Sequence, residues 1–202
     1  MGRIGIEKLL ANLRDTFGYD TNKFTIIGDA AMIMHGVINE VDKPILMVDL
    51  LTIQTMASKR GVPLKDSTDE VYGKVQYIDM GNALIITTSR LPSYHCVEDI
   101  GPFKVETLST IIMLLLVGGF ANKPKIQKCI DAGGYLLLEA WDSDLTYINN
   151  NYSSYPEYYE IIEPDEDGGK SQVMWKTLQG IETAKGDHIF LEYVGMMYIE
   201  TN

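Results

Sequence analysis

The sequence predicts a mixed α/β (α+β) protein in which a sheet is flanked by helices, and three observations lead to this prediction. Residues 6–17 place apolar side chains at helical spacing, so an amphipathic helix is expected to open the chain. Two short apolar runs, 24–27 and 45–51, are typical of strands. Between them, residues 30–35 are expected to form a short helix that ends at Gly36.

A second group of strands is expected in the middle of the chain. Residues 71–80 and 83–88 read as strands, and Gly81-Asn82 between them predicts a tight hairpin-like turn. Glycine pairs end two later helical runs, because glycine is favoured just beyond a helix. Further helices are thus expected at 52–60, 108–117 and 125–132, and further extended segments at 103–105 and 136–141.

The composition changes near residue 145. The next 25 or so residues are rich in Tyr, Asn, Ser and acidic side chains, which favours a surface excursion or linker. Alternation returns in 188–193 and 196–200, which we interpret as short strands. We therefore expect a core of residues 1–144 and an acidic, Tyr-rich extension of residues 145–202 that packs on this core.

The overall composition is that of a globular protein with a substantial core, at 46% hydrophobic and 22% charged residues. The two cysteines, Cys96 and Cys129, have no metal-ligand spacing and favour a reduced compartment, with one disulfide as the alternative. The strongest apolar run, 111–117, is too short to cross a bilayer, and no secretory signal is visible. We expect a soluble cytoplasmic protein with no membrane partner.

The net charge of −11 is concentrated towards the end of the chain. Residues 1–60 are neutral, whereas residues 151–202 carry three basic and ten acidic side chains. A phosphate backbone requires a cationic surface, so nucleic-acid binding is not expected. The charge suits a basic protein partner, or serves solubility alone.

The most informative segment is residues 24–52. A glycine turn at Gly28, directly before a helix, can present free N–H groups and the positive end of the helix dipole to a phosphate. Asp49 is a single carboxylate on the expected second strand, where it can hold a metal ion. The segment therefore has the layout of a nucleotide site.

Two motifs stand out in this segment: IIGDAAMIMHG, with Gly28 and the His35-Gly36 end, and MVDLL, with Asp49. Together they resemble the start of the nucleotidyltransferase superfamily, especially its antitoxin- and abortive-infection-associated branches, in which Asp49 would take the second position of an Asp-x-Asp pair. The later segment FKVETLSTIIMLLLVGGFANKPKIQKCI resembles the strand and helices that follow in the family. The resemblance covers roughly residues 6–140.

The resemblance implies the fold of the family and magnesium-dependent nucleotidyl transfer. This chain departs from the family in both of the motifs on which that reaction depends. In the family, acidic side chains hold magnesium ions that stabilise the attacking and leaving oxygens. Met47 stands at the first acidic position, and a thioether is a poor magnesium ligand. Asp29 stands in the glycine turn, where a carboxylate opposes a phosphate. The resemblance thus implies a nucleotidyltransferase-like protein with degenerate or absent catalysis.

Each candidate site residue has a structural alternative. If the site survives, Asp49 and Asp79 are the catalytic and magnesium-binding pair, with Asp29 as the alternative partner of Asp49, and Gly28 and Asp29 contact the nucleotide. The alternatives are an exposed strand end for Asp49, a turn entry for Asp79 and a helix N-cap for Asp29. Asp42 could replace the lost acid only if its loop folds inward. His35 is interpreted as a helix C-terminal residue that the dipole favours.

Three functions follow, in order of preference. The first is a nucleotidyltransferase-like protein that acts by binding a nucleotide or a protein partner. The second is an acidic interaction or inhibitor protein that engages a basic partner through its C-terminal third, where tyrosines cluster at 147, 152, 155, 158 and 159. The third is an active, divergent, magnesium-dependent nucleotidyltransferase.

Overall fold

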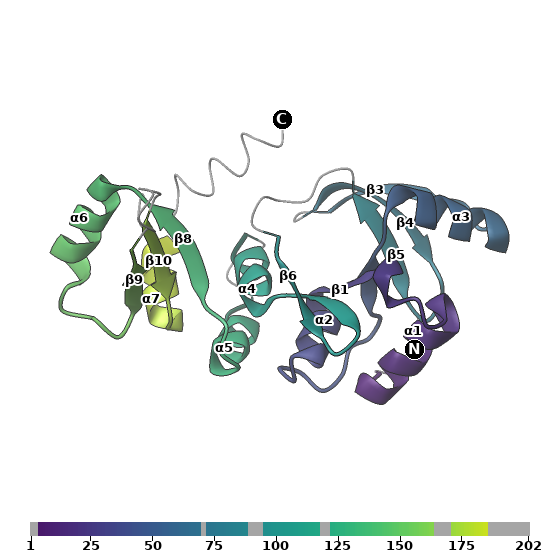
Figure 1. Ribbon diagram of the computed structural model, residues 1–202, viewed down its shortest axis with the longest axis horizontal. Helices are drawn as coiled ribbons and strands as arrows, with labels where there is room; N and C mark the ends of the chain where they lie inside the picture. Colours follow the sequence, from purple (N-terminus) through teal and green to yellow (C-terminus); the bar gives the residue numbers. More distant parts are fainter. Residues whose placement is uncertain (1–3, 70–71, 89–94, 118–121, 164–170, 186–202) are drawn as a thin grey trace. The chain divides into compact units, whose positions relative to one another are not determined.

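The computed structural model describes residues 4–69, 72–88, 95–117, 122–163 and 171–185 (Figure 1). The chain divides into two compact units, residues 1–119 and 120–202. This division falls earlier than the boundary we expected at 144/145. The helix and strand that we placed at the end of the core belong to the C-terminal unit.

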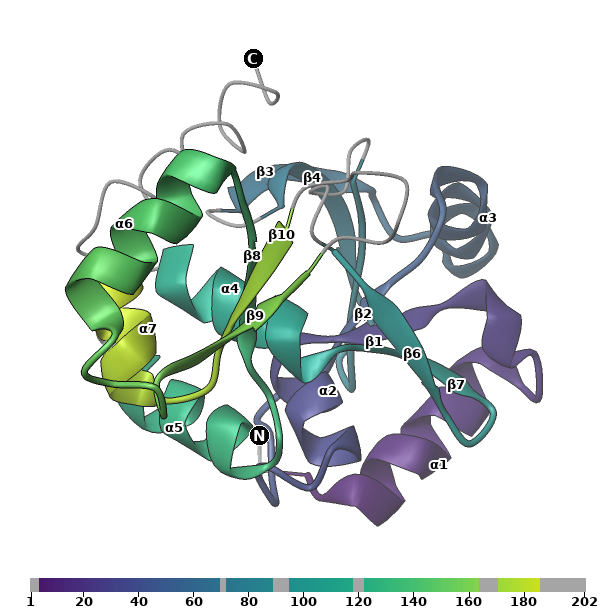
Figure 2. The ribbon, with the colours of Figure 1, turned by 60° about the vertical axis from the view of Figure 1, so that its left-hand side comes forward.

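The N-terminal unit has a mixed seven-stranded sheet with the order β3-β4-β5-β2-β1-β7-β6. This sheet confirms the predicted α/β class. Figure 2 shows β6 and β7 as a hairpin at one edge of it. Its elements are α1 (Ile6–Phe17), a 3-10 turn η1 (Thr21–Lys23), β1 (Thr25–Ile27), α2 (Gly28–Met34), β2 (Ile45–Met47), α3 (Leu50–Arg60), β3 (Lys65–Asp69), β4 (Gly73–Asp79), β5 (Leu84–Thr88), β6 (Val97–Ile100), β7 (Phe103–Glu106) and α4 (Leu108–Val117).

The sheet buries apolar side chains on both faces, because successive residues of a strand point to opposite sides. One face carries Ile26, Leu46 and Ile85, each at most 1% exposed. The other face carries Ile27, Met47 and Ile86, which are also buried and form a separate cluster. Helix α2 contacts β1, β2 and β7, and α3 contacts β4 and β5.

The register fixes which strand ends lie together. β1 and β2 are antiparallel, with Thr25 opposite Met47 and Ile27 opposite Ile45. β2 runs parallel to β5, and β1 runs parallel to β7. The start of β2 therefore lies beside the end of β1, where Gly28 follows, and the end of β2 lies at the opposite end of the sheet.

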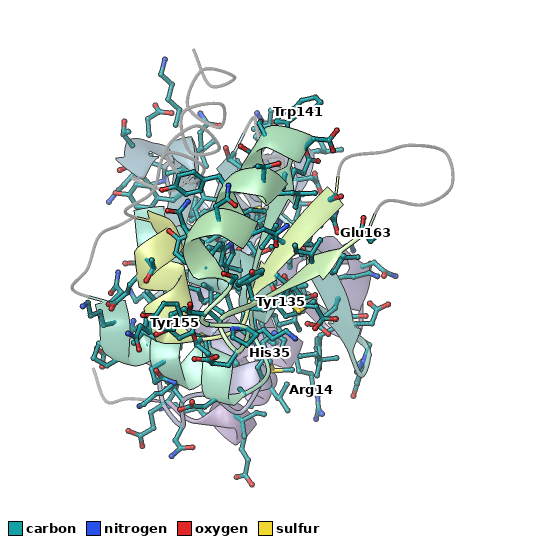
Figure 3. The ribbon with its side chains drawn as sticks, turned by 90° about the vertical axis from the view of Figure 1, so that its left-hand side faces the viewer. Arg14, His35, Tyr135, Trp141, Tyr155 and Glu163 are labelled. Carbon is teal, nitrogen blue, oxygen red and sulfur yellow. The ribbon has the colours of Figure 1, made fainter. Side chains whose placement is uncertain are left out.

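The C-terminal unit has an antiparallel three-stranded sheet with the order β8-β10-β9. Trp175 is its largest fully buried side chain, and the rings of Tyr152 and Tyr159 each lie 5.5 Å from it. Figure 3 shows Trp141 and Tyr155 at opposite ends of α6, and both are exposed. The elements are α5 (Lys123–Asp131), β8 (Leu136–Ala140), α6 (Asp142–Tyr152), β9 (Tyr159–Ile162), β10 (Ser171–Trp175) and α7 (Leu178–Lys185).

The C-terminal unit differs from our expectation of a surface excursion. Residues 142–152 form a helix, which Asp144 stabilises by accepting a 2.8 Å hydrogen bond from the Trp141 backbone N–H. The tyrosine cluster is divided, because Tyr152 packs in the core while Tyr155 stacks on Tyr158 nearer the surface. The strands expected at 188–193 and 196–200 lie outside the described residues.

Within the described ranges, no helix combines the length and the apolar character needed to span a membrane.

Candidate functional site

Gly28 lies where β1 passes directly into α2, as the sequence predicted. Its φ is +57°, in the left-handed region that favours glycine. A Cβ at this position would meet no atom within 4 Å, so the backbone conformation, and not space, requires glycine. The turn thereby exposes the first N–H groups of α2, which have no partner inside the helix.

The N–H group of Gly28 is bound by a carboxyl group of the protein itself. Glu106, the last residue of β7, is fully buried, and its Oε2 accepts a 2.8 Å hydrogen bond from Gly28 N–H. Parallel pairing of β1 with β7 brings the two residues together, because Ile26 opposite Val105 places Ile27 beside Glu106. A negatively charged or strongly accepting group is favoured at this position. Here the chain supplies that group.

Two further side chains lie against the other oxygen of Glu106. The Tyr72 hydroxyl donates a 2.8 Å hydrogen bond to Oε1, and its ring packs on the apolar cluster of Ile27, Met47 and Ile86. The side chain of His95 is only 4% exposed, and its Nε2 lies 3.2 Å from the same oxygen. The two atoms are close but not aligned for a hydrogen bond. Gly28, Tyr72, His95 and Glu106 are called the Glu106 cluster below.

His35, at the far end of α2, also binds to Glu106. Its Nε2–H donates a 2.8 Å hydrogen bond to the backbone carbonyl of Glu106. The predicted C-terminal position is correct, since His35 is the C-cap of α2. The ring therefore ties the end of α2 to the end of β7.

Asp29 is the second residue of α2, in its first helical turn and half-buried. It is not the N-cap that we considered, because the helix already begins at Gly28 and Ile27 is the cap residue. An acid in the first turn is favoured by the helix dipole.

Asp49 lies beyond β2, which ends at Met47 and is shorter than predicted. Asp49 is the N-cap of α3: its Oδ1 accepts from Thr52 N–H at 2.8 Å and its Oδ2 from Thr52 Oγ1 at 2.6 Å. The side chain is exposed to solvent. The hydrogen bond from the Thr52 hydroxyl, together with that from its N–H, holds the pKa of Asp49 below its ordinary value.

Asp79 ends β4 and is opposite Leu84, which is in turn opposite Ile45. Both of its oxygens accept from Lys43 Nζ at 2.8 Å, and Oδ1 also accepts from Gly81 N–H at the hairpin turn. The Lys43 ammonium is the main cause of a pKa of Asp79 below the ordinary value.

The structure does not bring Asp49 and Asp79 together. Asp79 lies in the row of Ile45, whereas Asp49 is four residues further along, or about 13 Å at strand spacing. Two carboxyl groups that share a magnesium ion need to lie within about 5 Å of each other. This pair does not fit a shared ion, and no group of three metal-ligating side chains occurs within the described residues.

Sequence reasoning missed Glu106 and Tyr72. The sequence predicted only a short extended segment at 103–105, and no local pattern marks the acid that follows it as buried. One signal was available: Glu106 lies just before the apolar helix that the resemblance includes. Only the pairing of β7 with β1, which are about 80 residues apart, places the carboxyl group against Gly28.

Comparison with protein-family models, with curated proteins and with solved structures gives no match to this chain.

Proposed function

We propose that this chain is a nucleotidyltransferase-like protein without catalytic activity, and that it acts by binding a protein partner. The proposal rests on the resemblance of residues 24–51 and on one observation above all. The carboxyl group of Glu106 accepts from Gly28 N–H, at the place where the resemblance puts a nucleotide phosphate. A bound phosphate would have to displace this acid, which is fully buried.

The chain also supplies a positive charge where the proposed ancestral site would have held a magnesium ion. A metal ion that bridges a phosphate at Gly28 and an acid on β2 has to lie at the Gly28 end of β2. The register puts Ile45 there, with Lys43 two residues before it. Lys43 Nζ donates to both carboxyl oxygens of Asp79, so the ammonium group takes the place of a cation that Asp79 could otherwise bind. Both features support a site that has lost its nucleotide and its magnesium ion.

Calorimetry tests the loss of nucleotide binding directly. ATP, GTP, CTP and UTP are titrated into the wild-type protein with and without magnesium, and transfer of labelled nucleotide is assayed in parallel. We expect no magnesium-dependent binding and no transfer. Magnesium-dependent binding of any of the four, abolished by Gly28→Val, would overturn the proposal. The partner is then sought by crosslinking in the cells that make the chain, with a defined protein in a fixed ratio as the expected product.

A second candidate function, an acidic interaction or inhibitor protein, is favoured by a separate observation. From Cys129 to Gly169 the chain has ten acidic residues and no Lys, Arg or His. Three of these acids, Glu157, Glu160 and Glu163, are exposed on or beside β9. Such a surface would attract a basic partner and speed its association at low salt.

Charge substitution tests this second function better than deletion does. Removing residues 152–169 would also remove Tyr152 and Tyr159, which pack on Trp175, so the unit would lose part of its core. Replacing Glu157 and Glu163 by Gln changes the charge and leaves that core intact. If a basic partner binds here, the variant should bind more slowly and with a weaker salt dependence. An unchanged rate would exclude the electrostatic function.

A further inference from the structure

A groove of about 560 Å³ lies in the N-terminal unit between the start of α3 and strands β3, β4 and β5. Its volume is in the range of small-ligand sites. In Figure 1, α3 lies beside these strands. Leu50, the first residue of α3, lines the groove and is 51% exposed. The groove is not part of the Glu106 cluster.

The lining of the groove includes a row of three polar side chains on neighbouring strands. Asp66 of β3 is opposite Gln76 of β4, which is opposite Thr87 of β5. Gln76 and Thr87 are two residues away from Ile78 and Ile85 on the same strands, and residues two apart on a strand point to the same face. Because Asp66 lies opposite Gln76, all three polar side chains share the face on which Ile78 and Ile85 are buried. Neighbouring side chains in such a row are about 5 Å apart.

The hydrogen-bonding capacity of this row is only partly used. Asp66 Oδ1 accepts a 2.9 Å hydrogen bond from Gln76 Nε2, which fixes the carboxyl group and leaves Oδ2 open. Thr87 is only 4% exposed, and its hydroxyl has no partner in the part of the chain that the structure describes. A polar ligand in the groove that reaches this hydroxyl can form a hydrogen bond with it.

We propose that this groove binds the vicinal diol of a sugar ring, either as a free sugar or as the ribose of a nucleoside. A carboxyl group that is fixed in place is well suited to accept from adjacent hydroxyls, as acidic side chains do for ribose. The Thr87 hydroxyl can both donate to and accept from a ring oxygen or hydroxyl. Lys74 also lines the groove and can bring donors to it, and Leu50 offers an apolar surface for the ring carbons.

Titration followed by NMR tests the proposal with three probes: D-ribose, adenosine and 2′-deoxyadenosine. Adenosine should shift the amide signals of Gln76 and Thr87, and 2′-deoxyadenosine should bind at least about tenfold more weakly, since it lacks the diol. Ribose distinguishes the sources: if it binds as adenosine does, the ligand is a sugar, and if only adenosine binds, it is a nucleoside. Silence with all three probes at millimolar concentration, or equal binding of the two nucleosides, overturns the proposal.

Matched variants locate the binding. Asp66→Asn and Thr87→Val keep the size of the side chains and should each weaken binding by about tenfold. Asp99→Asn is the control, because Asp99 is an exposed acid on β6, at the opposite edge of the same sheet from β3. Binding that all three variants weaken equally, or that Asp66→Asn leaves unchanged, would place the ligand elsewhere and overturn the assignment. The amide spectrum of each variant reports whether it has folded.

Discussion

At the end of the sheet that carries Gly28, the acid Glu106 is fully buried, accepts hydrogen bonds from a backbone N–H and a hydroxyl, and has a histidine nearby. At the end that carries Asp49, the acid is exposed and caps a helix within its own segment. Asp49 was the residue that the sequence marked for function, whereas Glu106 was not. The comparison teaches that the burial and the hydrogen bonds of an acid depend on its neighbours in the sheet, and that strand register determines these neighbours.

The largest effect is expected when the buried acid is removed. Glu106→Leu leaves Gly28 N–H and the Tyr72 hydroxyl without their acceptor, so we expect a loss of about 3 kcal/mol or more in the free energy of unfolding. Urea denaturation measures it. Glu106→Gln is the matched control, because it retains one acceptor oxygen and should lose clearly less. A loss below about 1 kcal/mol for Glu106→Leu would mean that the buried end is not held by this acid.

The turn that presents the N–H group is the next most sensitive feature. Gly28→Ala forces a side chain into the left-handed region, which should cost about 1–2 kcal/mol in the free energy of unfolding. Gly28→Asn should cost less, because Asn tolerates this conformation better. Thermal unfolding of both variants measures the difference. Equal stability of Ala and Gly would show that the turn relaxes without strain.

At the exposed end, the helix cap should contribute less than the buried cluster. Asp49→Ala removes the acceptor for two groups of Thr52, and loss of an N-cap typically costs about 1 kcal/mol. Asp49→Ser, which can still cap, should restore most of the stability. If Asp49→Ala instead left stability unchanged but abolished an activity, Asp49 would be a functional residue and the comparison would reverse.

Local pattern was enough to predict much of the fold. The spacing of apolar residues gave α1 its observed bounds, and the apolar runs with their glycine stops located β1, α2 and α4. These elements depend on neighbours in sequence. The edge strands β3 and β6 were missed, because KDSTD and VEDI lie at sheet edges and need no alternation of apolar side chains.

The candidate site was less predictable for a related reason. Gly28 was found because a strand, a glycine and a helix follow one another directly in the sequence. The predicted pair of Asp49 and Asp79 was wrong, because the two residues lie at different ends of the sheet. The sequence prediction extended β2 past Met47 and could not give the register between neighbouring strands. Glu106 depends on a parallel pairing of distant strands, and burial of an acid has no sequence pattern of its own. Local order is therefore predictable here, and long-range register is not.

The smallest expected effect concerns the ion pair between Lys43 and Asp79. The pKa of Asp79 is lowered by Lys43, so its stabilising contribution is present above the unfolded pKa, near about 4, and is lost as the pH falls through the lower folded pKa. Because Asp79 is exposed, we expect only a few tenths of a kcal/mol, screened by salt. Comparing wild type with Asp79→Asn by urea denaturation at pH 7 and pH 2.5 or so measures it: the difference in stability should shrink at the lower pH and at high salt. A difference that persists at low pH would mean that the hydrogen bond to Gly81 N–H, and not the charge of Lys43, is what Asp79 contributes to this end of the sheet.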